Sequence, residues 1–185
     1  NDYLYHNIGD SVILYTQDGK VLKQEEVSSY PCVGEDRPGL RYFRSVRTTG
    51  LNENTVVALF SARPLNTGTS YMKMWMPASS DVSYFTALAP GAKTASSPYQ
   101  NKPSLVVTMR KEKPAVKEPF VAVYEPISDK VSAGLIESVD RVKLDPQGEE
   151  GCAIKVNTKE GDTFTLVNIL KDGPVILNNQ KCCAD

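Results

Sequence analysis

The sequence predicts an all-β fold, an antiparallel β-sandwich of the supersandwich kind with little or no helix. Short apolar runs with a period of two, which are typical of half-buried strands, recur along the whole chain. Twelve Gly and 12 Pro residues are spread among them and supply many tight turns. Because helical segments do not separate the runs, we expect consecutive strands to pair antiparallel in a sandwich or barrel.

In the first half of the chain, Asp18-Gly19 is a hairpin-turn signal between two strands. Residues 55–62 are almost continuously apolar, as expected for a strand that is covered on both faces. Three Met residues alternate with Tyr71, Lys73 and Trp75, so the Met residues and Trp75 lie on opposite faces of the strand. Either Trp75 or the Met residues must therefore be exposed or covered by another element. The strands expected here are residues 11–16, 21–27, 42–48, 55–62 and 71–76.

In the second half, the segments on either side of Gly161 each place apolar residues on one face, which predicts a hairpin. Residues 133–144 carry some helical spacing, but their β-branched content makes a strand at least as good an interpretation. Two stretches are expected to be loops: residues 31–40, which contain two Pro and two Gly, and residues 87–103, which are rich in Ala, Ser, Pro and Gly. The strands expected here are residues 104–110, 119–124, 153–157, 163–168 and 175–177.

A chain of 185 residues is long enough for one full domain or at most two small ones. We expect a single β-sandwich domain over residues 1–185. Two subdivisions stay open: residues 1–16 as the last strand of a preceding β-domain, and a boundary near residues 126–130.

The charge balance and the histidine count exclude several classes of function. Twenty-one Lys and Arg residues against 22 Asp and Glu give a net charge of −1, which provides no global attraction to nucleic acid or anionic membranes. No apolar run approaches the roughly 18 residues of a membrane span. The single histidine, His6, excludes a two-His metal site and leaves at most one imidazole base. We therefore expect no metal and no cofactor.

The four cysteines contain no C-x-x-C pair, which argues against a zinc knuckle or a thioredoxin-like motif. Adjacent Cys182 and Cys183 could pair with each other only in a strained ring. A disulfide from one of them to Cys152 or Cys32 and free thiols on a frayed tail both remain open.

The chain offers few residues for catalysis. It has no G-x-S-x-G elbow and no glycine-rich phosphate loop before a helix. Tyr5 and His6 are weak candidates, because a Tyr and a His held together could act as acid and base in proton abstraction. As neighbours on one strand they point to opposite faces, which favours an edge strand with packed aromatic residues.

Three aromatic residues are candidates for substrate binding, because an apolar sugar face can stack on an aromatic ring. They are Trp75, Tyr84 and Tyr99, with Lys93 and Lys102 as nearby cations. Packing in the core is the more common fate of such aromatic residues.

Four ordered segments resemble the heparinase II/III-like polysaccharide lyases. Residues 2–9 are similar to a family element of the form H-D-Y-x-x-H, and His6 matches its second His. Residues 72–76 with Ala89-Pro90-Gly91 are similar to a second stretch. Residues 103–110 and 119–126 resemble a block of the form P-x-l-x-x-x-R followed by p-F-v-x-V-y-E-P. Together the segments cover most of residues 1–170.

The resemblance implies a part of an enzyme rather than a whole one. Such lyases combine an N-terminal α/α toroid with antiparallel β-sandwich domains, and some members hold a structural zinc. They cleave uronic-acid polysaccharides by β-elimination. Their Tyr and His catalytic residues would lie upstream of residue 1, and His6 would not be catalytic. The isolated chain is then expected to be inactive, and its partners would be the upstream catalytic domain and, through the parent enzyme, an acidic polysaccharide.

The chain begins at Asn1 without an initiator Met or a signal sequence, which fits a mature or excised piece. An excised sandwich should expose a former interdomain surface, and its first strand should lie at a sheet edge. A periplasmic or secreted location is expected. The alternatives are a free-standing carbohydrate-binding or adhesive β-sandwich module and, more remotely, a complete small lyase with Tyr5 or His6 as base.

Overall fold

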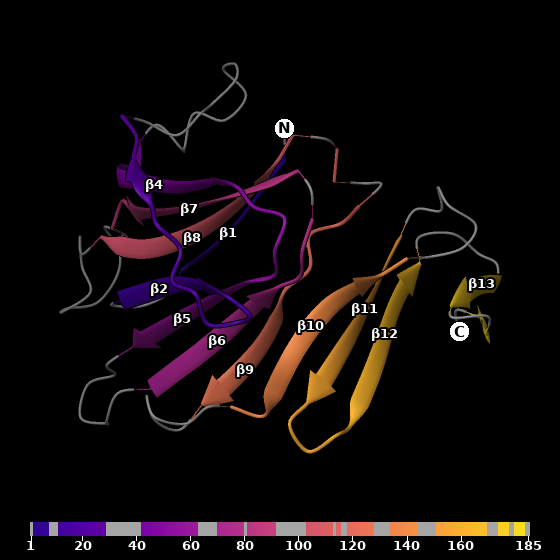
Figure 1. Ribbon diagram of the computed structural model, residues 1–185. Helices are drawn as coiled ribbons and strands as arrows, with labels where there is room; N and C mark the ends of the chain where they lie inside the picture. The colour runs from indigo at the N-terminus through magenta and orange to yellow at the C-terminus, as the bar shows by residue number, and fades with distance from the viewer. Residues whose placement is uncertain are drawn as a thin grey trace.

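The protein is all-β, with four antiparallel sheets and no α-helix in the part of the chain that the structure describes (Figure 1). The structure is a computed structural model. It describes residues 2–7, 11–28, 42–62, 70–79, 81–91, 103–112, 114–115, 118–127, 134–143, 151–169, 174–177 and 180–183.

Two large sheets face each other. The five-stranded sheet has the order β1 (Asp2–Asn7), β8 (Ser104–Lys111), β7 (Val82–Ala89), β4 (Arg44–Leu51), β3 (Glu25–Glu26). The four-stranded sheet has the order β2 (Ser11–Thr16), β5 (Val56–Ala62), β6 (Ser70–Met76), β9 (Val123–Ile127). A three-stranded sheet contains β10 (Ile136–Val142), β11 (Gly151–Thr158) and β12 (Thr163–Ile169), and a hairpin contains β13 (Pro174–Leu177) and β14 (Gln180–Cys183).

The main core lies between the two large sheets. Met74 and Val56 from the four-stranded sheet pack with Tyr84, Val107 and Met109 from the five-stranded sheet, all of them buried. Each such apolar side chain contributes roughly 1.5–3 kcal/mol on burial. This packing confirms the predicted sandwich.

The three-stranded sheet packs against the other face of the four-stranded sheet. Val57 and Trp75 form a second core there with Val139, Ile154 and Val156. Both faces of β5 and β6 are therefore covered, as the apolar run at residues 55–62 predicts. The Met face of β6 meets the five-stranded sheet, and the Trp75 face meets β10 and β11.

The predicted hairpin around Gly161 is confirmed as β11 and β12. Within its turn the Thr158 amide donates to the Asp162 carbonyl at 2.9 Å, and Gly161 has a φ of 91°. The ambiguous segment at residues 133–144 contains a strand, β10, whose Val139 and Arg141 pair with Val156 and Ile154 of β11.

Three expectations about strands are corrected. Residues 21–27 do not form one continuous strand. A single β-bridge joins Val21 to Tyr15, and Glu25–Glu26 then pair with β4 of the five-stranded sheet. Strand β7 is an additional strand, and it overlaps the start of the predicted loop 87–103. Both of its faces are covered, so even Ser83 and Thr86 are buried and no period of two marks the strand. The strand expected at residues 119–124 lies at Val123–Ile127.

The N-terminal segment joins both large sheets. Strand β1 lies at one edge of the five-stranded sheet and pairs with β8, while β2 pairs with β5. Pro126 and Ile127 belong to β9, which pairs with β6. The single-domain organisation and the two possible boundaries stay predictions. The expected loop at residues 31–40 lies outside the described residues.

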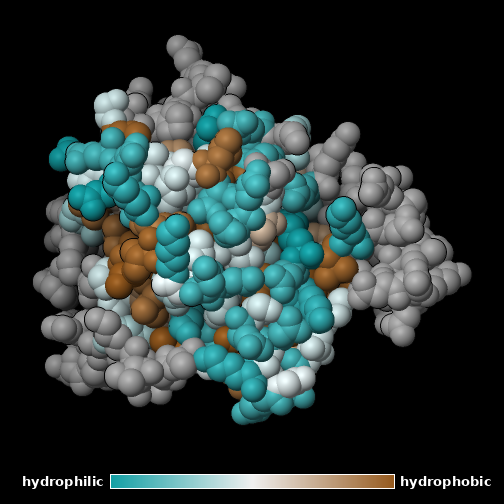
Figure 2. All heavy atoms as spheres, viewed as in Figure 1, coloured by the Kyte–Doolittle hydropathy of each residue, from teal (hydrophilic) through white to brown (hydrophobic). Residues whose placement is uncertain are grey.

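Polar residues cover most of the surface in one view, but not all of it. On the face drawn in Figure 2, hydrophilic side chains occupy most of the centre, and apolar side chains gather toward the left. Several large hydrophobic side chains are exposed: Ile13, Val21, Tyr42, Leu51, Tyr124, Leu135, Phe164 and Leu166.

Candidate functional site

A buried carboxylate fastens β9 to the beginning of β10. The Glu125 side chain lies on the face of β9 that the three-stranded sheet covers, and Trp75 Nε1 donates to Glu125 Oε2 at 3.0 Å. The backbone amides of Leu135 and Ile136 both donate to Glu125 Oε1, the second at 2.8 Å. Lys73 Nζ lies 4.0 Å from Glu125 Oε2. We call this arrangement the Glu125 clamp.

An open pocket of about 620 Å³ lies beside the Glu125 clamp. Tyr124 and Leu135 line it with partly exposed side chains. Lys159 is close, since its Nζ donates to the Gly134 carbonyl at 2.9 Å. An aromatic ring, an aliphatic side chain and a nearby cation are the elements that could contact an acidic sugar. The described lining residues are Tyr124, Glu125, Pro126, Ile127, Gly134, Leu135 and Ile136.

Burial dominates the electrostatics around the Glu125 clamp. It lowers the pKa of Lys73 from its usual value, the Glu125 carboxylate opposes that change, and Lys159 adds to it. Burial also raises the pKa of Tyr124. Burial, with a smaller contribution from Glu125, raises the pKa of Tyr15 to about 12. The Tyr15 phenol therefore keeps its proton at neutral pH.

The pKa of Tyr15 predicts a loss of stability in alkali. Because its pKa is about 12 in the folded chain against 10.0 normally, the folded state holds this proton more tightly than the unfolded state does. This contribution is complete below about pH 10 and falls as the pH rises toward about 12. Urea unfolding across this range should show the fall, and Tyr15→Phe should make it shallower. An identical fall in Tyr15→Phe would contradict the prediction.

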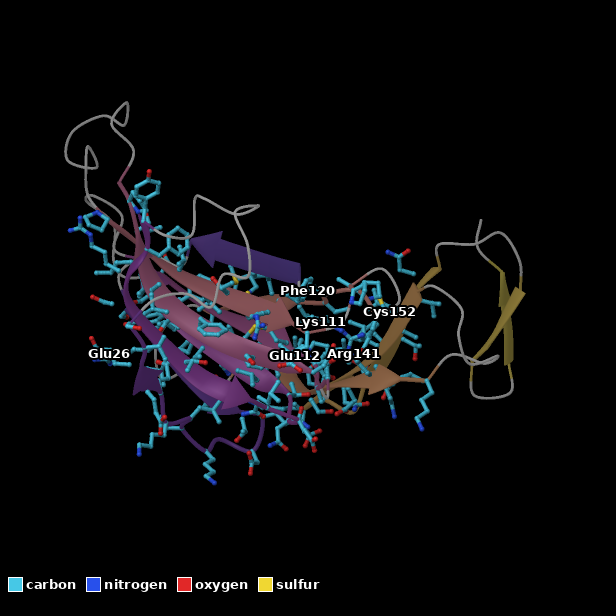
Figure 3. All side chains as sticks on the ribbon, turned by 90° about the horizontal axis from the view of Figure 1, so that it is seen from above. Glu26, Lys111, Glu112, Phe120, Arg141 and Cys152 are labelled. Carbon is cyan, nitrogen blue, oxygen red and sulfur yellow. The ribbon has the colours of Figure 1, made fainter. Side chains whose placement is uncertain are left out.

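A second polar centre lies at the junction of the sandwich and the three-stranded sheet (Figure 3). Lys111 is only 1% exposed, and its Nζ lies 3.0 Å from Glu118 Oε2, 3.7 Å from Asp81 Oδ1 and 3.3 Å from Ser79 Oγ. Arg141 Nε lies 3.6 Å from Glu118 Oε1. These five residues form the Lys111 cluster, in which each charged group has an opposite charge beside it.

Arg141 of the Lys111 cluster also acts on a buried tyrosine. The Tyr84 hydroxyl has no hydrogen-bond partner within the described structure. Burial raises the pKa of Tyr84, and Arg141 opposes that rise. The phenol therefore stays protonated at neutral pH, which does not suit it as a general base.

The structure describes two of the residues expected to bind substrate, Trp75 and Tyr84. Trp75 is 4% exposed and Tyr84 is 0% exposed, so neither ring presents a face to a sugar. The sequence could not show that the three-stranded sheet covers Trp75 or that Tyr84 faces the main core. Tyr99, Lys93 and Lys102 lie outside the described residues.

The two weak catalytic candidates lie on β1. Their positions in the register are opposite Thr108 for Tyr5 and opposite Val107 for His6, on the neighbouring strand β8. A catalytic role for Tyr5 or His6 stays a prediction.

Sequence reasoning did not single out Glu125 or Lys111 as site residues. A usable signal was present for Glu125, which is an isolated charge within an apolar run, V-A-V-Y-E-P. A charge in such a position is buried only when it is paired or hydrogen-bonded. Lys111 gave no such signal, because it stands in the charged run R-K-E-K that follows the apolar residues of its strand.

The described residues hold one free thiol and neither a metal-binding cluster nor a membrane-spanning helix. They contain no group of three His, Cys, Asp or Glu side chains that could hold a metal ion. Cys152 is a half-buried free cysteine. Within the described ranges, no helix has the length and apolar character needed to cross a membrane.

Part of the chain is homologous to part of a polysaccharide lyase. It is 37% identical over 128 residues to an endo-acting ulvan lyase of Formosa agariphila. The match covers 68% of this chain but 15% of that relative, so the chain corresponds to a small part of the larger enzyme. No protein-family model matches the chain. No solved structure matches it either.

Proposed function

We propose that this chain is the C-terminal, non-catalytic β-sandwich region of a heparinase II/III-like lyase that cleaves uronic-acid polysaccharides by β-elimination. The observation that carries the proposal is the match to 15% of the length of an ulvan lyase, at 37% identity over 128 residues. The ordered motifs of residues 2–9, 72–76, 103–110 and 119–126 support the narrower family.

The chemistry of β-elimination supports a non-catalytic role. The reaction needs a group that neutralises the uronate carboxylate and a base that removes the C5 proton. In the described structure, the buried cation Lys111 is paired with acidic side chains. The phenols of Tyr15 and Tyr84 both have a raised pKa. The role of the chain is then to support the catalytic domain of the parent enzyme.

Contact with an acidic polysaccharide is part of the same proposal. The pocket beside the Glu125 clamp would line one end of the substrate groove, with Tyr124 as the stacking residue and Lys159 as a cation. Lys93, Tyr99 and Lys102 remain candidates for the same contact. The parent protein would act in the periplasm or outside the cell, where polysaccharide is available.

The proposal predicts that the purified chain does not cleave polysaccharide. Incubation with ulvan, heparin, heparan sulfate or alginate should produce no ultraviolet absorbance from an unsaturated uronate. The ulvan lyase of Formosa agariphila serves as the positive control on ulvan. A substantial rate of polysaccharide cleavage by the isolated chain would contradict the proposal. Tight, saturable binding without cleavage would instead favour the free-standing carbohydrate-binding module.

A further inference from the structure

Strand β4 contains a β-bulge at Ser45. Arg44 stands opposite Leu88 of the neighbouring strand β7. Arg47, three residues later, stands opposite Thr86, which is only two residues away from Leu88, so β4 holds one extra residue. In the described part of the chain, Ser45 is the one non-glycine residue with a positive φ, 51°, a conformation that is disfavoured for a residue with a Cβ. Such bulges redirect the neighbouring side chains.

The bulge places Arg44 and Arg47 on one face of the five-stranded sheet. In a regular strand, residues three positions apart point to opposite faces. Thr86 and Leu88 are two positions apart and share a face, and residues opposite each other in an antiparallel pair share a face as well. Val46, inside the bulge, is instead buried in an apolar cluster on the other face. The Cα atoms of the two arginines are therefore about 7 Å apart along one face.

The two arginines are available to a ligand. Both side chains are exposed, and among the described residues neither guanidinium has a hydrogen bond or an ion pair. Tyr42, two residues before Arg44, is 56% exposed. Guanidinium groups bind planar oxyanions with two parallel hydrogen bonds, and an exposed aromatic ring stacks on the apolar face of a sugar. We call Tyr42, Arg44 and Arg47 the Arg44 patch.

We propose that the Arg44 patch binds an acidic polysaccharide, with the two guanidiniums on its sulfate or carboxylate groups and Tyr42 against a sugar ring. The ligand class rests on the proposed function, whereas the shared face of the arginines does not. The net charge of −1 provides no global attraction to polyanions, so binding depends on this local pair of cations. The patch belongs to the five-stranded sheet, unlike the pocket beside the Glu125 clamp, which β9 and the start of β10 line.

Affinity electrophoresis of the full chain tests the proposal. Dextran sulfate and alginate in the gel offer sulfate and carboxylate groups respectively, and unmodified dextran is the neutral control. At least one acidic polymer should retard the chain, and dextran should not. Arg44→Gln and Arg47→Gln should each weaken binding about fivefold. Lys143→Gln is the matched control, because it removes the same charge from an exposed position just after β10 and should leave binding unchanged. Circular dichroism verifies that each variant is folded.

A variant of unchanged composition distinguishes a site from bulk charge. Arg44→Ser combined with Ser45→Arg keeps the net charge but moves one guanidinium out of the position opposite Leu88, so it should weaken binding as much as Arg44→Gln does. Glu26, labelled in Figure 3, stands opposite Arg47 in the register. Glu26→Gln should therefore strengthen binding, because it removes a carboxylate that competes with the ligand.

Three outcomes would overturn the proposal. They are no retardation by either acidic polymer, wild-type affinity in the variant that exchanges residues 44 and 45, and equally tight binding of a single-stranded oligonucleotide, which would indicate a general polyanion surface. None of these outcomes bears on whether the chain is a non-catalytic part of a lyase. Conversely, cleavage of polysaccharide by the chain would contradict that function and leave binding at the Arg44 patch standing.

Discussion

Replacing Lys111 with methionine is expected to lower the free energy of unfolding by about 3–5 kcal/mol, the usual effect of breaking a buried ion pair from one side. Lys111 Nζ is 3.7 Å from the buried Asp81 carboxylate and 3.0 Å from Glu118. The contact with Glu118 contributes less, because that side chain is 42% exposed and water screens it. Methionine keeps most of the aliphatic volume, so the loss reports mainly the buried charge of Asp81 without its ammonium partner.

Urea unfolding measures this effect, and thermal unfolding should show a Tm lower by about 10 °C. Glu112→Ala is the matched control, because Glu112 follows Lys111 directly, is exposed, and should change the stability by less than about 0.5 kcal/mol. The double variant Lys111→Met with Asp81→Asn should be more stable than the sum of its single variants implies, since it removes both charges. A loss below about 1 kcal/mol for Lys111→Met would mean that the Lys111 cluster is not an ion-pair network.

The elements that could be predicted from the sequence are those with local determinants. The hairpin of β11 and β12 combines two alternating strands with a Gly161 that adopts a positive φ, so all of its signals lie within 20 residues of each other. Residues 55–62 were also predictable, because Val56, Val57 and Ala58 are all fully buried and leave no polar face in the sequence.

What could not be predicted depends on contacts between distant segments. Strand β7 lies between β4 and β8 with both faces covered, so the absence of alternation concealed it. Whether Trp75 and Tyr84 are exposed depends on which sheet covers each face of their strands, and a period of two does not contain that information. The Glu125 clamp likewise requires backbone amides from residues 135 and 136, which become its partners only when β10 docks.

Replacing Gly134 with alanine is expected to lower the free energy of unfolding by about 3–4 kcal/mol, for two separable reasons. Gly134 has a φ of +74°, a conformation that costs an L-residue roughly 1–2 kcal/mol. A Cβ at this position would also lie 2.6 Å from Glu125 Cδ and 2.7 Å from Glu125 Oε2. The carboxylate has little freedom to move, because Trp75 Nε1 and the amides of Leu135 and Ile136 hold it.

Gly50→Ala separates the two costs. Gly50 has nearly the same φ, +70°, but nothing lies within 4 Å of a Cβ there, so its loss should be only about 1–2 kcal/mol. Glu125→Ala removes the group that a Gly134 Cβ would meet. In the Glu125→Ala background, Gly134→Ala should therefore cost no more than Gly50→Ala does, a coupling of about 2 kcal/mol between positions 125 and 134. Equal losses for Gly134→Ala with and without Glu125 would show that backbone strain alone, and not the Glu125 clamp, requires glycine at this position.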